Sequence, residues 1–144
     1  MITTERIKMK TASGVSFQDV TARVAEIVAQ SGVSSGSAVV FTRHTTTGIV
    51  INEAEERLLQ DMTSFLERLA PRSKQYLHDD VELRDCPADE PKNGHSHLKA
   101  LCLPKSETIP IIDGALALGR WQAVLFVELD DSRERELLVQ IRGE

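Results

Sequence analysis

The stretch that decides the fold is QAVLFVEL, residues 122–129, in which only the first and seventh residues are polar. A strand with one face in water alternates apolar and polar residues, whereas an unbroken apolar run is typical of a strand covered on both faces. The sequence therefore predicts a central strand over 122–129 with other elements packed on each side. Glu128 stands near its end, where a buried carboxylate is costly unless it is paired or bound to a metal.

Shorter strand patterns lie before and after this segment. Apolar and β-branched runs bounded by turn residues predict strands at 2–10, 15–17, 38–44, 48–51, 97–103, 108–112, 115–118 and 134–142. Asp113-Gly114 predicts a tight hairpin turn between two of them. Strands around the helices and a later run of strands predict an α+β fold. We expect mainly an antiparallel β-sandwich with two amphipathic helices in a single domain.

Two segments have the apolar periodicity of amphipathic helices. In residues 18–31 an apolar stripe recurs every three or four positions, and Gly32 is expected to end the helix. The second helix is expected to follow Asn52, a candidate cap that has Glu55 three residues further on in the reach-back position. Pro71 is expected to end this second helix.

Length and composition limit the protein to a few classes. With 144 residues, of which 41% are hydrophobic and 27% charged, the chain has the size and composition of one globular domain. Its net charge of -5 argues against nucleic acid as the main partner. There is no apolar run of about 20 residues and no apolar signal region, so no membrane partner is expected. Two cysteines, Cys86 and Cys102, are too few for a disulfide framework, so a cytoplasmic location is expected.

Four histidines lie at the edges of predicted elements or in a long polar segment over 72–96. His44 ends a strand, His78 lies in the polar segment, and His95 and His97 flank its exit. In an extended chain a His-x-His pair places both imidazoles on one side, at a spacing suited to one metal ion. The alternative is that these are ordinary solvated or core histidines. Spacing alone leaves open which three would act together.

Several other residues have a structural explanation beside a functional one. Glu53 suits the start of a helix, where its charge complements the helix dipole. Glu128 either binds a metal or forms an ion pair with Arg133 or Arg135. Arg120-Trp121-Gln122 offers a cation, a ring and an amide to a ligand, or else ends a hairpin with the ring in the core. The motifs of nucleotide-binding loops and of serine hydrolases are absent.

The motifs of this sequence, taken in order, resemble those of one protein family. They are His44-Thr45-Thr46, Asn52-Glu53, Asp61, Tyr76-x-His78, Asn93-x-x-x-His97-Leu98-Lys99, Ile109-Pro110, Asp113-Gly114, Leu118-Gly119-x-Trp121-Gln122, Glu128-x-Asp130 and Arg133-x-Arg135. Each motif is modest, but the ordered set covers nearly the whole chain and is specific. On these residues the chain resembles the YjbQ-like family, also called the secondary thiamine-phosphate synthase family.

The resemblance implies one YjbQ-like domain over residues 1–144, a compact α+β sandwich and a homotrimer, with a histidine-bound metal in some members. It also implies a weak thiamine-phosphate synthase activity, which joins a pyrimidine diphosphate to a thiazole phosphate with loss of pyrophosphate. Matched by position, the metal ligands are His44, His78 and His97, whereas His95 lies where the family varies.

We consider three functional hypotheses. The first is a metal-dependent enzyme acting on a phosphorylated small molecule, with zinc as the expected ion and magnesium as the alternative for a diphosphate substrate. Its expected catalytic residues are Glu53, Glu128 and Arg133, and its expected substrate-binding residues are Thr45, Thr46, Lys99, Arg120, Trp121 and Gln122. Glu53, Trp121, Glu128 and Arg133 are expected beside the three histidines in one pocket. The alternatives are a metal-dependent hydrolase of another substrate and a non-catalytic, metal-containing trimeric binding protein.

Overall fold

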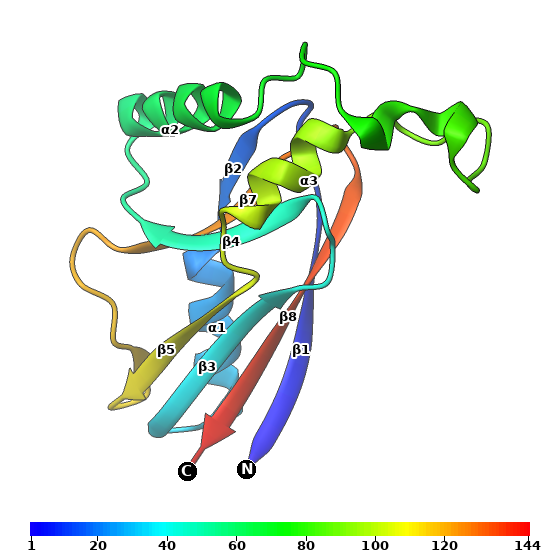
Figure 1. Cartoon of the computed structure of the whole chain (residues 1–144). Coiled ribbons are helices and arrows are strands. Elements are labelled where there is room, and N and C mark those ends of the chain that lie inside the picture. The colour runs from blue at the N-terminus through cyan, green and yellow to red at the C-terminus, as the bar shows by residue number, and fades with distance from the viewer.

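The computed structural model describes all 144 residues. Its regular elements are two antiparallel sheets and three α-helices (Figure 1). Sheet A contains, in spatial order, β1 (Ile2–Lys10), β8 (Glu134–Gly143), β3 (Ser35–Thr42), β5 (Ser106–Ile112) and β6 (Ala115–Leu116). Sheet B contains β2 (Ser16–Asp19), β7 (Ala123–Glu128) and β4 (Thr47–Asn52). The helices are α1 (Thr21–Ser31), α2 (Glu56–Leu69) and α3 (Gly94–Leu101). The predicted α+β sandwich is confirmed.

The central strand predicted over 122–129 is β7, the middle strand of sheet B. All of its residues are buried, and successive side chains point to opposite faces of the sheet. Val124 and Phe126 belong to the core between the two sheets, whereas Val127 belongs to a second core on the other face of sheet B. The prediction of a strand covered on both faces is therefore confirmed.

Two hydrophobic cores hold the layers together (Figure 1). The larger core lies between the sheets and includes the apolar stripe of α1, with Val24 and Val28 fully enclosed. The smaller core joins α2 and α3 to sheet B through Leu66, Ala100, Val127 and Leu129. Sheet B is therefore fixed on both faces, and the loops at its two ends extend from a rigid base.

Two predicted turn positions have the expected backbone conformation. Gly32 ends α1 with a φ of 73°, in the left-handed region where glycine carries no steric penalty. Asp113 and Gly114 join β5 to β6 with φ values of 52° and 77°, and positive φ at both central residues is typical of a type I′ hairpin turn. Both predictions are confirmed.

Residues 97–103 do not form the predicted strand, because most of them belong to α3. The apolar run is too short for periodicity to separate a strand from a buried helix. Successive residues of an α-helix are rotated by about 100°, so residues two apart point about 200° apart. His95 and His97 therefore face different surroundings, and the paired imidazoles of an extended His-x-His are not formed.

The cap of α2 also differs from the prediction. Asn52 is the last residue of β4, and its Oδ1 accepts a hydrogen bond from the backbone N–H of Glu53 at 2.8 Å. Glu55 is the N-cap, and its carboxylate accepts from the backbone N–H of Leu58 at 2.5 Å. A carboxylate satisfies a free N–H of the first turn and complements the helix dipole. The capping box from Asn52 to Glu55 is therefore replaced by a single cap three residues later.

The sequence predicts a long polar connection over 72–96; residues 72–93 form such a connection, whereas 94–96 are the first residues of α3. Residues 72–93 include two short 3-10 turns, η1 (Leu77–Asp79) and η2 (Val81–Leu83), and part of the segment extends away from the sheets (Figure 1). Leu77 is 87% exposed and Leu83 is 81% exposed.

None of the three α-helices combines the length and the apolar character needed to cross a bilayer.

Candidate functional site

A polar pocket lies at the end of sheet B where β4 begins and β7 ends. It has a volume of about 430 Å³, and we call it the histidine pocket. Its lining residues are Arg43, His44, Thr45, Thr46, Glu90, Pro91, Asn93, His97, Arg133 and Arg135. Of the predicted site residues, this pocket brings together His44, Thr45, Thr46, His97 and Arg133.

Two of the three predicted metal ligands meet beside this pocket. The imidazole rings of His78 and His97 have centroids 4.6 Å apart, at an interplanar angle of 71°. η1 is held against the start of α3, because Asp79 Oδ1 accepts a hydrogen bond from the backbone N–H of Gly94 at 2.9 Å. An added Cβ at Gly94 would lie 2.8 Å from the Cβ of Tyr76. Glycine at this position therefore permits the close approach that places His78 on His97.

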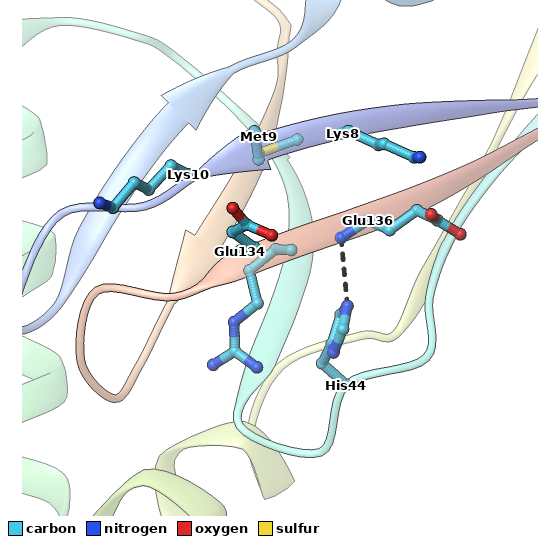
Figure 2. Close-up of a pocket in the computed structure, with 7 residues that line it drawn as sticks. Lys8, Met9, Lys10, His44, Glu134 and Glu136 are labelled. Carbon is cyan, nitrogen blue, oxygen red and sulfur yellow. Dashed lines mark hydrogen bonds between the residues drawn. The ribbon is translucent and has the colours of Figure 1, made fainter.

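The third predicted ligand, His44, is held by a different interaction. Its Nε2 accepts a hydrogen bond from the backbone N–H of Glu136 at 3.1 Å (Figure 2). A ring nitrogen that accepts this bond has its lone pair occupied, so it does not bind a metal at the same time. No three His, Cys, Asp or Glu side chains are grouped so as to hold a metal ion. In this conformation the three predicted histidines therefore do not form one ligand set.

Two buried polar atoms near the start of α3 have no hydrogen-bond partner, namely Nε2 of His78 and Oδ1 of Asn93. The orientation of the Asn93 amide follows from its neighbour, because Nδ2 donates to Oδ2 of Asp130 at 2.6 Å and Oδ1 is left as the free acceptor. Imidazole nitrogen and amide oxygen are both groups that bind metal ions. His78, His97 and Asn93 therefore fit a divalent ion better than a set that includes His44.

Burial favours neutral imidazoles at the histidine pocket. Desolvation lowers the pKa of His44, and the charge of Arg135 lowers it further. Desolvation also lowers the pKa of His97, with a smaller contribution from His78. The neutral imidazole of His97 is therefore able to bind a metal ion through its lone pair, whereas that of His44 already accepts a hydrogen bond from Glu136.

A buried ion pair forms the base of the histidine pocket. Glu128 is fully buried, and Arg135 donates from Nε and Nη2 to its two carboxylate oxygens at 2.8 and 2.6 Å. Thr11 Oγ1 and the backbone N–H of Asp130 donate to the same carboxylate at 2.6 and 3.1 Å. Arg135 also donates to Oγ1 of Thr46 at 2.9 Å. Glu128 thus positions Arg135, which is the ion pair that the sequence left as the alternative to a catalytic role.

Two further arginines at the pocket use only part of their guanidinium groups. Arg133 Nη1 donates to Oδ2 of Asp130 at 2.5 Å, and Arg43 Nη2 donates to Oε1 of Glu136 at 3.1 Å. Each guanidinium has five N–H groups, so donors remain for a ligand. The planar arrangement of these donors matches the oxygens of a phosphate or carboxylate group.

A second hollow adjoins the histidine pocket across β1 and β8 (Figure 2). It has a volume of about 500 Å³ and is lined by Lys8, Met9, Lys10, His44, Glu134, Arg135 and Glu136. His44 and Arg135 belong to both hollows. Lys8 and Lys10 therefore add two cations to this side of the molecule, and Glu134 and Glu136 add two carboxylates.

Lys99, which was predicted to bind substrate, does not line the histidine pocket. Its side chain is fully buried, its Nζ donates to His95 Nδ1 at 2.8 Å, and it pairs with Glu67 Oε1 at 3.1 Å. Desolvation lowers the pKa of His95, and the charge of Lys99 lowers it further. This network links α2 to α3, so Lys99 lies between two helices instead of facing the pocket.

The remaining predicted site residues lie at the opposite end of sheet B. A hollow of about 420 Å³ lies there, which we call the Trp121 patch. Four of the residues that line it were predicted site residues, namely Glu53, Arg120, Trp121 and Gln122. Its other lining residues are Asp19, Thr21, Ala54, Glu55 and Ala123. β4 and β7 run between the two hollows, and a strand of this length spans about 17 Å. The expectation that Glu53 and Trp121 lie beside the histidines therefore does not hold within one chain, because a paired strand separates them.

Trp121 is not the core anchor that the sequence offered as one alternative. Its side chain is 64% exposed, and the guanidinium carbon of Arg120 lies 4.7 Å from the centre of its ring. The loop that carries it is held by Gln122, whose Oε1 accepts from the backbone N–H of Gly119 at 2.8 Å. The ring is therefore presented to the outside on an ordered loop.

Sequence reasoning gave no site role to several residues that line or support the histidine pocket, among them Thr11, Arg43, Glu90 and Asn93, although Asn93 belongs to one of the motifs. Asn93 carried a usable signal, because it stands four residues before His97 and this spacing places two side chains on one helix face. The four-residue spacing of Asn93 and His97 indicates a shared face only once residues 94–101 are known to be helical. Thr11 carried none, because its contact with Glu128 joins residues 117 positions apart.

The fold and the pocket define a class of small α+β sandwich proteins with a histidine- and arginine-lined hollow at one end of a sheet. Two solved structures share this fold over the whole chain. A YbjQ-like protein of unknown function from Sulfolobus solfataricus P2 has a TM-score of 0.89 and 33% sequence identity, covering 100% of this chain and 99% of that chain. A hypothetical protein from Aeropyrum pernix K1 has a TM-score of 0.89 and 34% identity, covering 99% of both chains.

The sequence comparisons agree with the structural ones. The family model for UPF0047 protein YjbQ-like matches residues 5–144. A UPF0047 protein from Methanothermobacter thermautotrophicus is 37% identical over 140 residues, covering 97% of this chain and 92% of that protein. Another from Archaeoglobus fulgidus is 40% identical over 134 residues, covering 93% and 97%. The chain belongs to the UPF0047, or YjbQ-like, family, as its ordered motifs predicted.

Proposed function

We propose that the protein is a metal-dependent enzyme that binds a phosphorylated small molecule in its histidine pocket. The observation that carries this proposal is the combination of three arginines and two histidines of lowered pKa around one polar hollow. Two of the arginines, Arg133 and Arg135, are fixed by buried carboxylates. Cations held in position in this way stabilise the charge of a phosphoryl or pyrophosphoryl group without reorganising during the reaction.

In this proposal the residues of the pocket have distinct roles. Arg43 and Arg133 bind phosphate oxygens through their remaining N–H groups, and Arg135 supplies a fixed positive charge from below. Thr45 contributes a hydroxyl at the rim. The lowered pKa of His97 leaves its imidazole neutral near neutral pH, so its lone pair is available to a metal ion.

The specific reaction that the family resemblance suggests is thiamine-phosphate synthesis. The ring nitrogen of the thiazole phosphate forms a bond to the methylene carbon that carries the diphosphate of the pyrimidine, the C–O bond between that carbon and the diphosphate breaks, and pyrophosphate departs with its electron pair. The arginines stabilise the negative charge of the departing group. Hydrolysis of another phosphorylated substrate uses the same features. Two observations favour the non-catalytic alternative. Glu128 is fully paired, and Glu53 lies at the far end of the sheet.

A divalent ion, zinc or else magnesium, belongs to this proposal. His78, His97 and Asn93 would hold it, since two of their buried polar atoms have no other partner. An ion bound there supplies a Lewis acid for the phosphoryl oxygens. We further propose a homotrimer in the cytoplasm, supported by the family resemblance, by the exposed leucines of the segment before α3 and by two unpaired cysteines.

The binding step is tested by calorimetric titration with inorganic pyrophosphate. We expect Arg133→Gln to weaken binding at least about tenfold, because a hydrogen bond to a charged group contributes roughly 1.5–3 kcal/mol. Arg57→Gln is the matched control, since Arg57 is exposed on α2 and lines neither the histidine pocket nor the Trp121 patch. Equal affinities in Arg133→Gln and wild type would contradict the proposed site.

The chemical step is tested separately on the wild-type protein. Elemental analysis identifies a bound metal, and turnover of the two thiamine precursors is then measured with and without a chelator. Product that disappears with the chelator supports the metal-dependent synthase. Release of phosphate without coupling indicates the hydrolase, and pyrophosphate binding without any turnover indicates the binding protein.

A further inference from the structure

Asp130 belongs to one of the sequence motifs, yet the proposed function gives it no role. Its buried side chain contacts two residues that line the histidine pocket, one assigned to the metal ion and one to phosphate. We propose that Asp130 is a positioning residue, which orients Asn93 for the metal ion and Arg133 for the anion. This inference rests on the proposed function, because it concerns the two ligands of that same site.

A single oxygen atom of Asp130 makes both contacts. Oδ2 accepts a hydrogen bond from Nδ2 of Asn93 at 2.6 Å and another from Nη1 of Arg133 at 2.5 Å. Hydrogen bonds to an ionised carboxylate are shorter and roughly twice as strong as those between neutral groups. Asn93 is 7% exposed and Asp130 is 3% exposed, so bulk water hardly competes for the contact between them. The two donors are therefore held in fixed positions relative to each other.

The backbone that carries Asp130 is itself held in place. The N–H of Asp130 donates to Oε2 of Glu128 at 3.1 Å, and the N–H of Leu129 donates to the backbone oxygen of Thr46 at 3.1 Å. Glu128 is the last residue of the buried strand β7. A group orients its neighbours well only when its own position is fixed, and Asp130 meets this condition.

Asn93 forgoes a local hydrogen bond in this arrangement. It occupies the N-cap of α3, where the side-chain oxygen of an asparagine normally accepts an N–H of the first helical turn. Here the side chain makes no such bond, and Oδ1 is buried without a partner. A buried acceptor without a partner costs stability. Asp130 thus holds the amide in an orientation that the helix start does not favour, with its oxygen free for a metal ion.

Arg133 is held by the same oxygen of Asp130. Its backbone N–H donates to Oγ1 of Thr11 at 3.1 Å, and its side chain is 33% exposed at the pocket. Because the guanidinium group is planar and rigid, the bond from Nη1 also sets the directions of its remaining N–H groups. Without this bond the anion itself would have to order a long flexible side chain, which weakens binding.

The charge of Asp130 allows its role to be tested by the sign of an effect. A carboxylate near an anion site repels the anion, so electrostatics alone predicts that its removal strengthens the binding of pyrophosphate. If Asp130 orients Arg133, its removal weakens this binding instead, because the guanidinium loses its fixed orientation. The direction of the change therefore separates a positioning role from a simple effect of charge.

The test is calorimetric titration of wild type and Asp130→Asn, both freed of metal. Inorganic pyrophosphate and zinc are titrated into separate samples, because pyrophosphate itself binds zinc. We expect pyrophosphate to bind the variant about three- to tenfold more weakly, as when an anion must order a flexible side chain. We expect zinc to bind it about 10–100-fold more weakly, as is typical when a residue that orients metal ligands is changed.

Asp131→Asn is the matched control, because it removes the same charge from the next residue. The side chain of Asp131 is 51% exposed, and its carboxylate bonds to Ser13 and Arg72 instead of the pocket residues. Both affinities are expected to stay at the wild-type level in this variant.

Variants of the two oriented residues complete the test. Arg133→Gln is expected to weaken the binding of pyrophosphate alone, and Asn93→Ala that of zinc alone, whereas Asp130→Asn weakens both. Adding Asp130→Asn to Arg133→Gln is expected to cause no further loss of pyrophosphate affinity, because Asp130 acts through Arg133.

The outcomes distinguish this inference from the proposed function. Pyrophosphate affinity that is unchanged or higher in Asp130→Asn, unchanged zinc affinity, or additive losses in the double variant would each overturn the positioning role while the proposed site stands. A wild type that binds neither ligand would overturn the proposed function and this inference with it. Circular dichroism identifies any variant that is not folded at the temperature of the titration.

A measurement on the unmodified protein keeps the inference testable if Asp130→Asn does not fold. Because Asn93 and Arg133 share one acceptor, an anion that draws on Arg133 changes the hydrogen bond of Asn93. We expect the side-chain amide signal of Asn93 in a proton–nitrogen correlation spectrum to move and saturate during titration with inorganic pyrophosphate. An amide signal that stays in place while pyrophosphate binding saturates would contradict the inference.

Discussion

At the scale of single residues, the chemistry of the histidine pocket depends on which polar atoms are already occupied. Both carboxylate oxygens of Glu128 accept hydrogen bonds from the guanidinium group of Arg135, so this pair acts as a fixed support. His44 is engaged by the backbone of Glu136, whereas His78 and Asn93 each retain a buried free atom. Sequence reasoning identified the histidines but had no means of ranking them, because these partners come from distant strands and loops.

The Glu128–Arg135 pair gives the first prediction at this scale. Glu128→Gln leaves the buried guanidinium of Arg135 without a counter-charge, and breaking a buried pair in this way costs about 3–5 kcal/mol. Urea unfolding of wild type and variant measures the difference in the free energy of unfolding. Asp131→Asn is the control, since Asp131 and Arg72 are both 51% exposed and such pairs contribute at most about 1 kcal/mol. Equal losses in the two variants would show that Glu128 is not a structural support.

At the scale of elements, the sequence predicted strands and turns better than the segment that forms the site. β7 was recognisable because its apolar run is unbroken and bounded by turn residues. The turn at Asp113-Gly114 was recognisable because few dipeptides adopt two positive φ values. α3 was missed because its apolar residues are few and three of its polar residues, His95, Ser96 and Lys99, are buried, so the helix lacks a clear division into an apolar and a polar face. The cap of α2 was displaced because β4 continues through Asn52.

The contact between η1 and α3 gives a prediction about this missed element. Gly94→Ala introduces a Cβ that would lie 2.8 Å from Tyr76, so η1 must move away from α3 and His78 must move away from His97. We expect a loss of about 1–3 kcal/mol in the free energy of unfolding together with weaker metal binding, measured by denaturation and by titration with zinc. Gly119→Ala is the control, because its nearest contact would be an ordinary 3.4 Å to the side chain of Gln122. Unchanged zinc affinity in Gly94→Ala would show that metal binding does not depend on the contact between η1 and α3, and it would contradict this prediction.

At the scale of the whole molecule, the sandwich places two chemically different surfaces at the two ends of one buried sheet. One end carries the cations and imidazoles, and the other carries carboxylates and an exposed indole ring. The ordered motifs contain most residues of the histidine pocket and three of the Trp121 patch, namely Glu53, Trp121 and Gln122, yet motif order could not divide them between the ends. Their division depends on the direction of β4 and β7, which is a property of the folded sheet.

The central claim, that the histidine pocket binds phosphate groups, is tested most directly by NMR of the imidazole nitrogens during titration with inorganic pyrophosphate. The chain has four histidines, so each signal is assigned by a single substitution. We predict that the signals of His44 and His97 move together and saturate, whereas that of His95, buried against Lys99, stays in place. Signals that all remain unchanged at millimolar pyrophosphate, or a response confined to His95, would contradict the account.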